Sequence, residues 1–280
     1  IYLVKYNIFQ SQNCERGPMI QLLQTIIAIL IFLFGASLFS FLNVVIYRVP
    51  RKISFVGGRS FCPDCRHTLG APDMFPVLSY LFLRGKCRYC KAHISLRYPL
   101  VEILGGLSSL LCMAVYIDWE GDLWKGFLRF LTAFALLAVL TVVAFVDWDT
   151  MEIPNGFVLA AAVCGLVSFF AFPETGLLER LIGVFAVSVP LLLITLLVPG
   201  AFGGGDIKLM AACGLYLGWK LCLTAFVAAV LTGGIYGAYL LLSRKKGRKD
   251  HFAFGPFLCA GVVFAMFCGQ MLIDWYLQFL

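Results

Sequence analysis

Charged side chains are scarce in this sequence. Asp, Glu, Lys and Arg make up 13% of its 280 residues, whereas hydrophobic residues make up 61%. A soluble globular domain carries about 25% charged residues, so this scarcity excludes an ordinary soluble enzyme or binding module. We therefore interpret the chain as a membrane protein.

The sequence also lacks the short motifs that mark most hydrolases and nucleotide-binding proteins. It contains no GxSxG, no HExxH, and no phosphate-binding loop that ends in Lys-Ser or Lys-Thr. No cysteine is paired with a plausible catalytic histidine. These absences argue against a Ser or Cys nucleophile and against a catalytic zinc, and they leave carboxylates as the candidates for chemistry.

Long apolar runs dominate the chain. A membrane-spanning helix needs about 20 mostly apolar residues, and eight stretches reach or approach that length. We predict an all-α polytopic membrane protein with about eight transmembrane helices. The stretches are 19–47, 99–117, 126–146, 157–172, 181–198, 207–218, 219–242 and 252–279.

The positive charge is concentrated in two loops. Ten of the 22 Lys and Arg residues lie between Arg48 and Arg97, and a second basic run lies at 244–249. The positive-inside rule places both loops in the cytoplasm, and threading the spans puts loops 147–156 and 199–207 on the same face. Topology and anionic lipid headgroups explain the net charge of +7, so we predict a lipid bilayer and no nucleic acid as a partner.

These patterns divide the chain into four parts. Residues 1–18 begin with Ile and have no periodic pattern, so we expect an N-terminal extension. The first transmembrane helix follows at 19–47 and a cytoplasmic loop at 48–98. The remaining helices form a membrane domain at 99–280.

The large loop carries two CxxC pairs, Cys62 with Cys65 and Cys87 with Cys90, separated by 21 residues. Four-cysteine zinc sites typically have about 15 to 20 residues between their pairs. We predict a closed, structural zinc site; two disulfides or free thiols are the alternatives, and a reducing cytoplasm disfavours disulfides. We interpret His67 and His93 as surface histidines near the site.

Acidic residues stand at two membrane boundaries. Asp147 and Asp149 follow one apolar run, and Asp206 follows three glycines at 203–205. An ionisable group at the edge of the hydrocarbon is costly and is a functional candidate. The glycines permit positive φ and a close approach of another chain, such as an extended peptide substrate.

Two carboxylates that share one water are sufficient to hydrolyse a peptide. One takes a proton from the water and the other donates a proton to the scissile carbonyl. Interfacial, solvated acids are the simplest alternative. A transporter with a proton or cation path through Asp147 and Asp206 and a zinc-binding scaffold without catalysis are the other two.

Several motifs in order resemble one known family, the bacterial type IV prepilin peptidases, also called leader peptidase/N-methyltransferases, which belong to the GxGD class of membrane aspartyl proteases. The resemblance covers roughly residues 35–260. It rests on segments 40–50 and 94–102, both CxxC pairs, an acid seven residues before Pro154, and Gly203-x-Gly205-Asp206. Segment 69–76 departs from the family pattern, because it lacks an expected Trp and Asn.

The resemblance implies a two-aspartate endopeptidase of the bacterial cytoplasmic (inner) membrane, with its active site facing the cytoplasm. The first catalytic acid is then Asp147, with Asp149 as the fallback, and the second is Asp206. The substrates are prepilin or pseudopilin precursors that carry a basic leader. The resemblance further implies N-methylation of the new amino terminus with S-adenosylmethionine, associated with the zinc loop, and it makes 99–280 the peptidase domain.

Four further residues are candidates for shaping the site: Gly203, Gly205, Lys208 and Glu102. Glu102 has two interpretations, because it can face the site or anchor the membrane interface. The helix dipole suggests which acid holds the proton: Asp147 ends a helix, where the field is negative, and Asp206 opens one. We therefore expect Asp147 to be protonated and Asp206 to be the ionised base.

Overall fold

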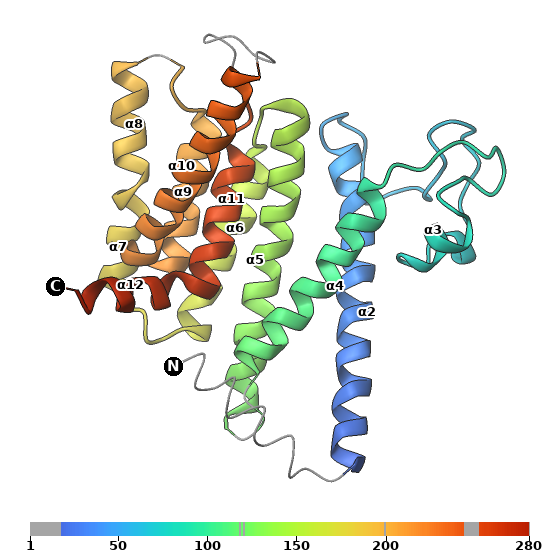
Figure 1. The fold of residues 1–280 in the computed structure, drawn as a ribbon, viewed down its shortest axis with the longest axis horizontal. Coiled ribbons are helices and arrows are strands. Elements are labelled where there is room, and N and C mark those ends of the chain that lie inside the picture. The colour runs from blue at the N-terminus through green and yellow to red at the C-terminus, as the bar shows by residue number, and fades with distance from the viewer. Residues whose placement is uncertain (1–17, 118, 120, 199, 244–251, 280) are drawn as a thin grey trace. The chain divides into compact units, whose positions relative to one another are not determined.

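The computed structural model describes residues 18–117, 119, 121–198, 200–243 and 252–279 (Figure 1). These residues form helices and connecting loops, and the β pairing among them consists of isolated bridges. The all-α prediction is therefore confirmed. The predicted N-terminal extension and the basic run at 244–249 lie outside the described residues, apart from Pro18.

The helices keep the order of the apolar runs. The longer ones are α2 (Pro18–Arg48), α4 (Arg97–Tyr116), α5 (Leu123–Thr150), α6 (Asn155–Ala171), α7 (Leu177–Ala186), α8 (Ser188–Leu197), α9 (Gly204–Leu217), α10 (Trp219–Leu242), α11 (Gly255–Phe264) and α12 (Gln270–Leu277). The large loop contains a 3-10 turn, η1 (Ala71–Asp73), and a short helix, α3 (Leu78–Phe82). A π-helical turn, η2 (Ala265–Gly269), joins α11 to α12.

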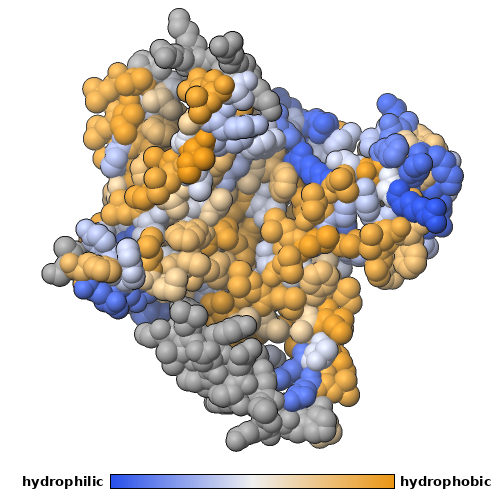
Figure 2. All heavy atoms as spheres, in the orientation of Figure 1, coloured by the Kyte–Doolittle hydropathy of each residue, from blue (hydrophilic) through white to orange (hydrophobic). Residues whose placement is uncertain are grey.

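All eight predicted apolar segments are helical. Six helical stretches of the described chain are long and apolar enough to cross a membrane: Gln21–Arg48, Arg97–Tyr116, Leu123–Thr150, Leu177–Leu197, Trp219–Leu242 and Gly255–Leu277. The other two predicted spans are shorter helices, α6 with 17 residues and α9 with 14. Apolar side chains cover much of the visible surface (Figure 2), as expected for a multi-pass membrane protein.

The chain forms two compact units. The first contains residues 1–43 and 59–111, and the second contains 44–58 and 112–280. In the first unit α2 packs on α4 where glycines remove side-chain bulk: a Cβ on Gly105 would collide with Phe39, and one on Gly106 with Phe32. Ser109 Oγ also donates to Ile31 O at 2.9 Å. The predicted domain boundaries at 48 and 98 stay a prediction.

Helix α5 is the most buried of the long helices. In its most apolar part 67% of the residues are buried, compared with 17–33% in the other five long stretches. Leu136 and Leu140 of α5 join Leu209 and Met210 of α9 and Leu258 of α11 in one core. Glycines again allow close contacts, because a Cβ on Gly214 of α9 would collide with the backbone of α7.

A fully buried arginine supports the helix ends opposite the N-terminus of α9. Arg180 of α7 donates to the carbonyl oxygens of Ser168 and Phe172 at the end of α6, and to those of Leu215 and Tyr216 at the end of α9. The last carbonyls of a helix have no partner within the helix, and a cation there also interacts favourably with the helix dipole. Arg180 therefore fixes α6 against α9.

Candidate active site

Asp147 lies in the last turn of α5. Its side chain is buried, with 5% of the residue exposed, whereas Asp149 two residues later is exposed. The helix ends at Thr150, and Met151 adopts a left-handed conformation with φ 55° while its N–H donates to Asp147 O at 2.8 Å. The chain reverses there and leads through Ile153 into α6. Helix phase therefore buries Asp147 and leaves Asp149 at the surface.

Asp206 lies in the first turn of α9, outside the six long apolar stretches. It is also buried, with 8% of the residue exposed. Its Oδ2 accepts from the backbone N–H of Gly203 at 3.1 Å, so the side chain caps its own helix. The carboxylate is thereby held at the positive end of the α9 dipole.

Of the three glycines before Asp206, Gly205 is the one in close contact with a neighbouring segment. Gly203 has φ −72°, and Gly204 and Gly205 are the first residues of the helix, so none of the three uses the positive φ that glycine permits. A Cβ on Gly205 would lie 2.8 Å from the Cβ of Ile153. Gly205 is thus required because the connection between α5 and α6 crosses directly over α9.

The N-terminus of α11 supplies a contact that the sequence did not reveal. The N–H of Gly255 donates to Asp147 Oδ2 at 2.9 Å, across 108 positions of sequence. A Cβ on Gly255 would lie 2.6 Å from that oxygen. Helix initiation at Gly255-Pro256 is visible in the sequence, but nothing in it indicates that this helix end meets Asp147.

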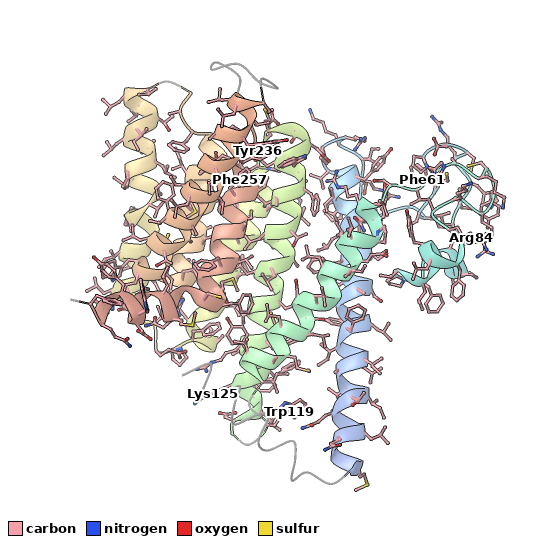
Figure 3. The ribbon with its side chains drawn as sticks, in the orientation of Figure 1. Phe61, Arg84, Trp119, Lys125, Tyr236 and Phe257 are labelled. Atoms are coloured by element: carbon pink, nitrogen blue, oxygen red, sulfur yellow. The ribbon has the colours of Figure 1, made fainter. Side chains whose placement is uncertain are left out.

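Aromatic rings hold the start of α11 in place. Phe254 lies 5.6 Å from Phe202, measured between ring centroids, so the segments that lead into α9 and α11 pack together. Tyr236 of α10 lies 5.2 Å from Phe257 of α11, and both are labelled in Figure 3. Two helix N-termini therefore converge beside the end of α5.

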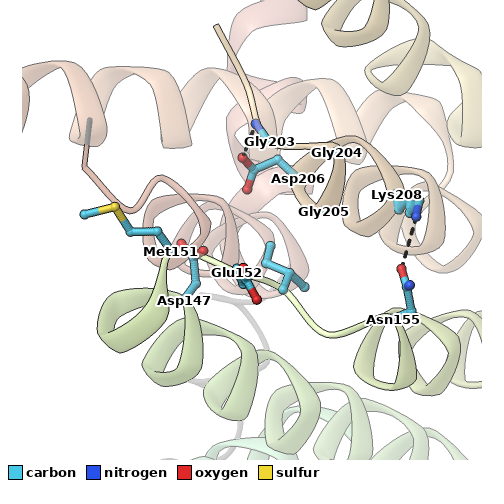
Figure 4. A pocket seen from close by; sticks show the side chains of 10 residues that line it. Asp147, Met151, Glu152, Asn155, Gly203, Gly204, Gly205, Asp206 and Lys208 are labelled. Atoms are coloured by element: carbon cyan, nitrogen blue, oxygen red, sulfur yellow. Dashed lines mark hydrogen bonds between the residues drawn. The ribbon is translucent and has the colours of Figure 1, made fainter. Parts of the chain in front are cut away.

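The two aspartates share one cavity of about 330 Å³. Figure 4 shows Asp147 from α5 and Asp206 from α9 facing it. Lys208 also lines it, and its Nζ donates to Asn155 Oδ1 at 3.1 Å. Asp149 is not part of the lining. The complete lining is Asp147, Met151, Glu152, Ile153, Asn155, Gly203, Gly204, Gly205, Asp206 and Lys208.

The cavity favours a proton on Asp206. Burial raises the pKa of Asp206 to about 6, and the negative charge of Asp147 contributes to the rise, while the Gly203 N–H opposes it. Two carboxylates in one cavity disfavour double ionisation, so they titrate as a pair. This arrangement is the one that acid–base hydrolysis requires, with one carboxyl protonated and the other ionised.

The four cysteines of the large loop converge. The Sγ atoms of Cys62, Cys65, Cys87 and Cys90 all lie within 4.8 Å of one another, and Cys62 Sγ lies 3.9 Å from Cys90 Sγ. Four sulfurs around a tetrahedral zinc, each bonded at about 2.3 Å, are separated by about 3.8 Å. The cluster therefore fits a metal ion of that size.

Both CxxC turns have the same backbone form. The residue after each pair, Arg66 or Lys91, has positive φ, and its N–H donates to the carbonyl of the first cysteine. Backbone N–H groups of Cys90 and Tyr89 lower the pKa of Cys87 to about 7, whereas the pKa of Cys90 rises to about 12 because the Ala92 N–H is outweighed by burial and by the neighbouring thiols. His67 stacks on Tyr89 and is not part of the cluster.

Glu102 belongs to the first compact unit. Its Oε2 accepts from the backbone N–H of Val77 at 2.7 Å, and Ser40 also donates to its side chain. Glu102 therefore ties the large loop to α4. Whether Glu102 also faces the site or anchors the membrane interface stays a prediction.

A multi-pass membrane fold and two buried carboxyl groups on one cavity define the class: a membrane aspartic peptidase. Residues 33–116 match the bacterial peptidase A24 N-terminal domain, and residues 134–238 match the type IV leader peptidase family. The chain belongs to the type IV leader peptidase family. No solved structure matches it.

Curated relatives agree over nearly the whole chain. The prepilin leader peptidase/N-methyltransferase of Bacillus subtilis is 33% identical over 253 residues, covering 89% of this chain and 97% of the relative. The Aeromonas salmonicida protein of the same name is 32% identical, with 89% and 93% covered. That of Legionella pneumophila is 31% identical, with 88% and 93% covered.

Infrared spectroscopy tests the protonation of the pair. Because the pKa of Asp206 is raised to about 6, the C=O band of its protonated carboxyl group should lose intensity as the pH rises from about 5 to about 7. An ordinary Asp side chain loses its proton at a lower pH, about 4. Asp206→Asn should remove this band and Asp149→Asn should leave it. A band that persists unchanged in Asp206→Asn contradicts the assignment.

Proposed function

We propose that this protein cleaves the basic leader from type IV prepilin or pseudopilin precursors at the cytoplasmic face of the bacterial inner membrane, with Asp147 and Asp206 as the catalytic pair. The observation that carries the proposal is the shared cavity lined by both carboxyl groups. Membership of the leader peptidase family supports it, and so do relatives that are named prepilin leader peptidases.

The reaction follows from the two protonation states. Ionised Asp147 takes a proton from a water molecule, and the oxygen of that water bonds to the scissile carbonyl carbon. Asp206 gives its proton to the carbonyl oxygen. The C–N bond then breaks as Asp147 gives its proton to the leaving amine and a hydroxyl of the tetrahedral intermediate returns a proton to Asp206, which restores both groups. This reverses the roles expected from helix position, because each carboxylate faces a helix N-terminus and the pKa of Asp206 is the one raised to about 6 by burial and by the charge of Asp147.

Charge in the cavity suits a basic leader. Three acids line it, Asp147, Glu152 and Asp206, and the cation there, Lys208, is bonded to Asn155. Ion pairing with leader residues would place the scissile bond beside the aspartates, while the apolar segment of the precursor stays in the lipid. Gly203, Gly205 and Lys208 shape the cavity in this proposal, and Glu102 supports the large loop.

We propose that the four cysteines hold a structural zinc ion. All four positions are filled by protein sulfur, so the site offers no open position for catalysis. We further propose that the protein methylates the amino terminus that cleavage exposes, as the names of its relatives state for those proteins. S-adenosylmethionine would supply the methyl group when bound, and we assign no residue to its binding.

Single substitutions in the acids test the catalytic pair. Asp147→Asn and Asp206→Asn should each reduce kcat for leader removal by about 10² to 10⁴-fold, the usual contribution of general acid–base catalysis. Asp149→Asn, which lies outside the cavity, should keep near-parental activity. Cleavage is followed by mass spectrometry of a purified precursor in detergent. Full activity in Asp206→Asn would exclude the proposed pair.

Gly255 tests whether α11 positions Asp147. In Gly255→Ala the new Cβ must displace the Asp147 carboxylate, and a misplacement of about 1 Å can cost about 10²-fold in rate. We expect kcat to fall with little change in KM. Gly234→Ala is the matched control, because a Cβ at Gly234 meets no atom within 4 Å. Equal kcat in both variants would contradict the positioning role.

Replacing a cysteine tests the metal site. Cys87→Ser should lose the zinc measured by elemental analysis of the purified protein, because it removes one of four ligands. Cys268→Ser, outside the cluster, should retain it. The same samples, incubated with a precursor and S-adenosylmethionine, report leader loss and N-methylation by mass spectrometry. Zinc retained in Cys87→Ser would contradict the assignment.

A further inference from the structure

The short helix α3 carries an exposed apolar face. Leu78, Leu81 and Phe82 are spaced i, i+3 and i+4, so they share one side of the helix, and Phe75 lies just before it. Phe82 is 83% exposed, Leu81 63%, Phe75 61% and Leu78 47%. We call these four residues the α3 patch. A cluster of large apolar side chains of this kind marks a contact surface.

The patch belongs to an ordered part of the loop. On the other side of α3, Tyr80 packs so closely on Gly85 that a Cβ there would lie 2.7 Å from the Tyr80 hydroxyl. Asp73 accepts from Arg88 Nε at 2.6 Å and from the N–H of Gly70 at 3.2 Å. These contacts fix which face of α3 turns outward.

A hydrogen bond sets the position of α3 along α4. Val77, the residue before α3, donates its N–H to Glu102 Oε2 at 2.7 Å. Val77 has φ 61° and ψ −48°, a conformation that β-branched residues rarely adopt. The chain therefore accepts an unfavourable backbone angle at the point where it meets α4.

Glu102 is five residues inside α4, which begins at Arg97. At 1.5 Å per residue it lies about 7.5 Å along the helix from that end. The headgroup layer on each side of the hydrocarbon is about 5 to 8 Å thick. If the first turn of α4 lies among the headgroups, Val77 and the start of α3 lie near the boundary between headgroups and acyl chains.

Basic side chains follow the patch. Arg84 and Lys86 come directly after α3, and both are exposed. An apolar face next to Lys and Arg side chains is typical of elements that lie in the interface of a membrane with anionic lipids. Water is an unfavourable surrounding for the patch, and α2 and α4, between which the loop lies in sequence, are long and apolar enough to cross a bilayer.

We propose that the α3 patch inserts at the boundary between headgroups and acyl chains of the bilayer that the protein spans. The large loop then has a third membrane contact besides α2 and α4. The lipid acyl chains contact Phe75, Leu78, Leu81 and Phe82. The basic residues contact anionic headgroups. The proposal concerns the first compact unit and does not depend on the cleavage reaction.

Quenching by brominated lipid tests the insertion. Phe82→Trp is reconstituted as the purified full chain into vesicles of phosphatidylcholine and phosphatidylglycerol, with and without bromine on the acyl chains. We expect bromine to quench the added fluorescence, measured as the difference from the parent, and iodide in the buffer to leave it unquenched. Phe61→Trp, beside the first cysteine pair, is the matched control and should show the reverse.

Other outcomes contradict the proposal. Quenching of Phe82→Trp by iodide and not by bromolipid means that the patch faces water. Protection from both quenchers means that protein covers it, and protection that disappears when the protein is diluted in lipid identifies a second copy as the cover. Zinc content equal to that of the parent shows that the variant loop has folded.

Discussion

Among the residues that the structure describes, the hydrogen-bond donors to the two buried carboxylates are backbone N–H groups at helix N-termini. A carboxylate withdrawn from water is costly unless it accepts hydrogen bonds, and the first N–H groups of a helix have no partner within that helix. Gly203 supplies one to Asp206 and Gly255 supplies one to Asp147. The site therefore exists where the starts of α9 and α11 meet the end of α5.

The packing of the second unit brings these helix ends together. In hydrocarbon the interior of a helix keeps its backbone groups satisfied, so polar chemistry is confined to helix ends and to cavities. Gly205 lets the connection after α5 cross α9, and Arg180 holds the far ends of α6 and α9 together. Small residues and one buried cation thus align helices whose surfaces are otherwise apolar.

The first unit uses a different set of polar contacts. Glu102 joins α4 to the large loop through Val77, and Asp73 joins two turns of that loop through Arg88. The four cysteines are brought together by two turns of the same backbone form. A loop with little apolar core gains its order from these contacts, and a bound metal would add to it.

The sequence by itself determined the all-α membrane fold, the cysteine cluster and the two boundary acids, because apolar runs, CxxC spacing and isolated charges are local signals. Only the tertiary structure decided which groups meet. Gly255 lies 108 positions from Asp147, and Glu152 and Asn155 enter the cavity because the chain reverses at Met151. The packing of Gly205 against Ile153 is a further contact of this kind, and residues 203–205 do not use positive φ. Such contacts depend on how helices pack, and no local pattern encodes that.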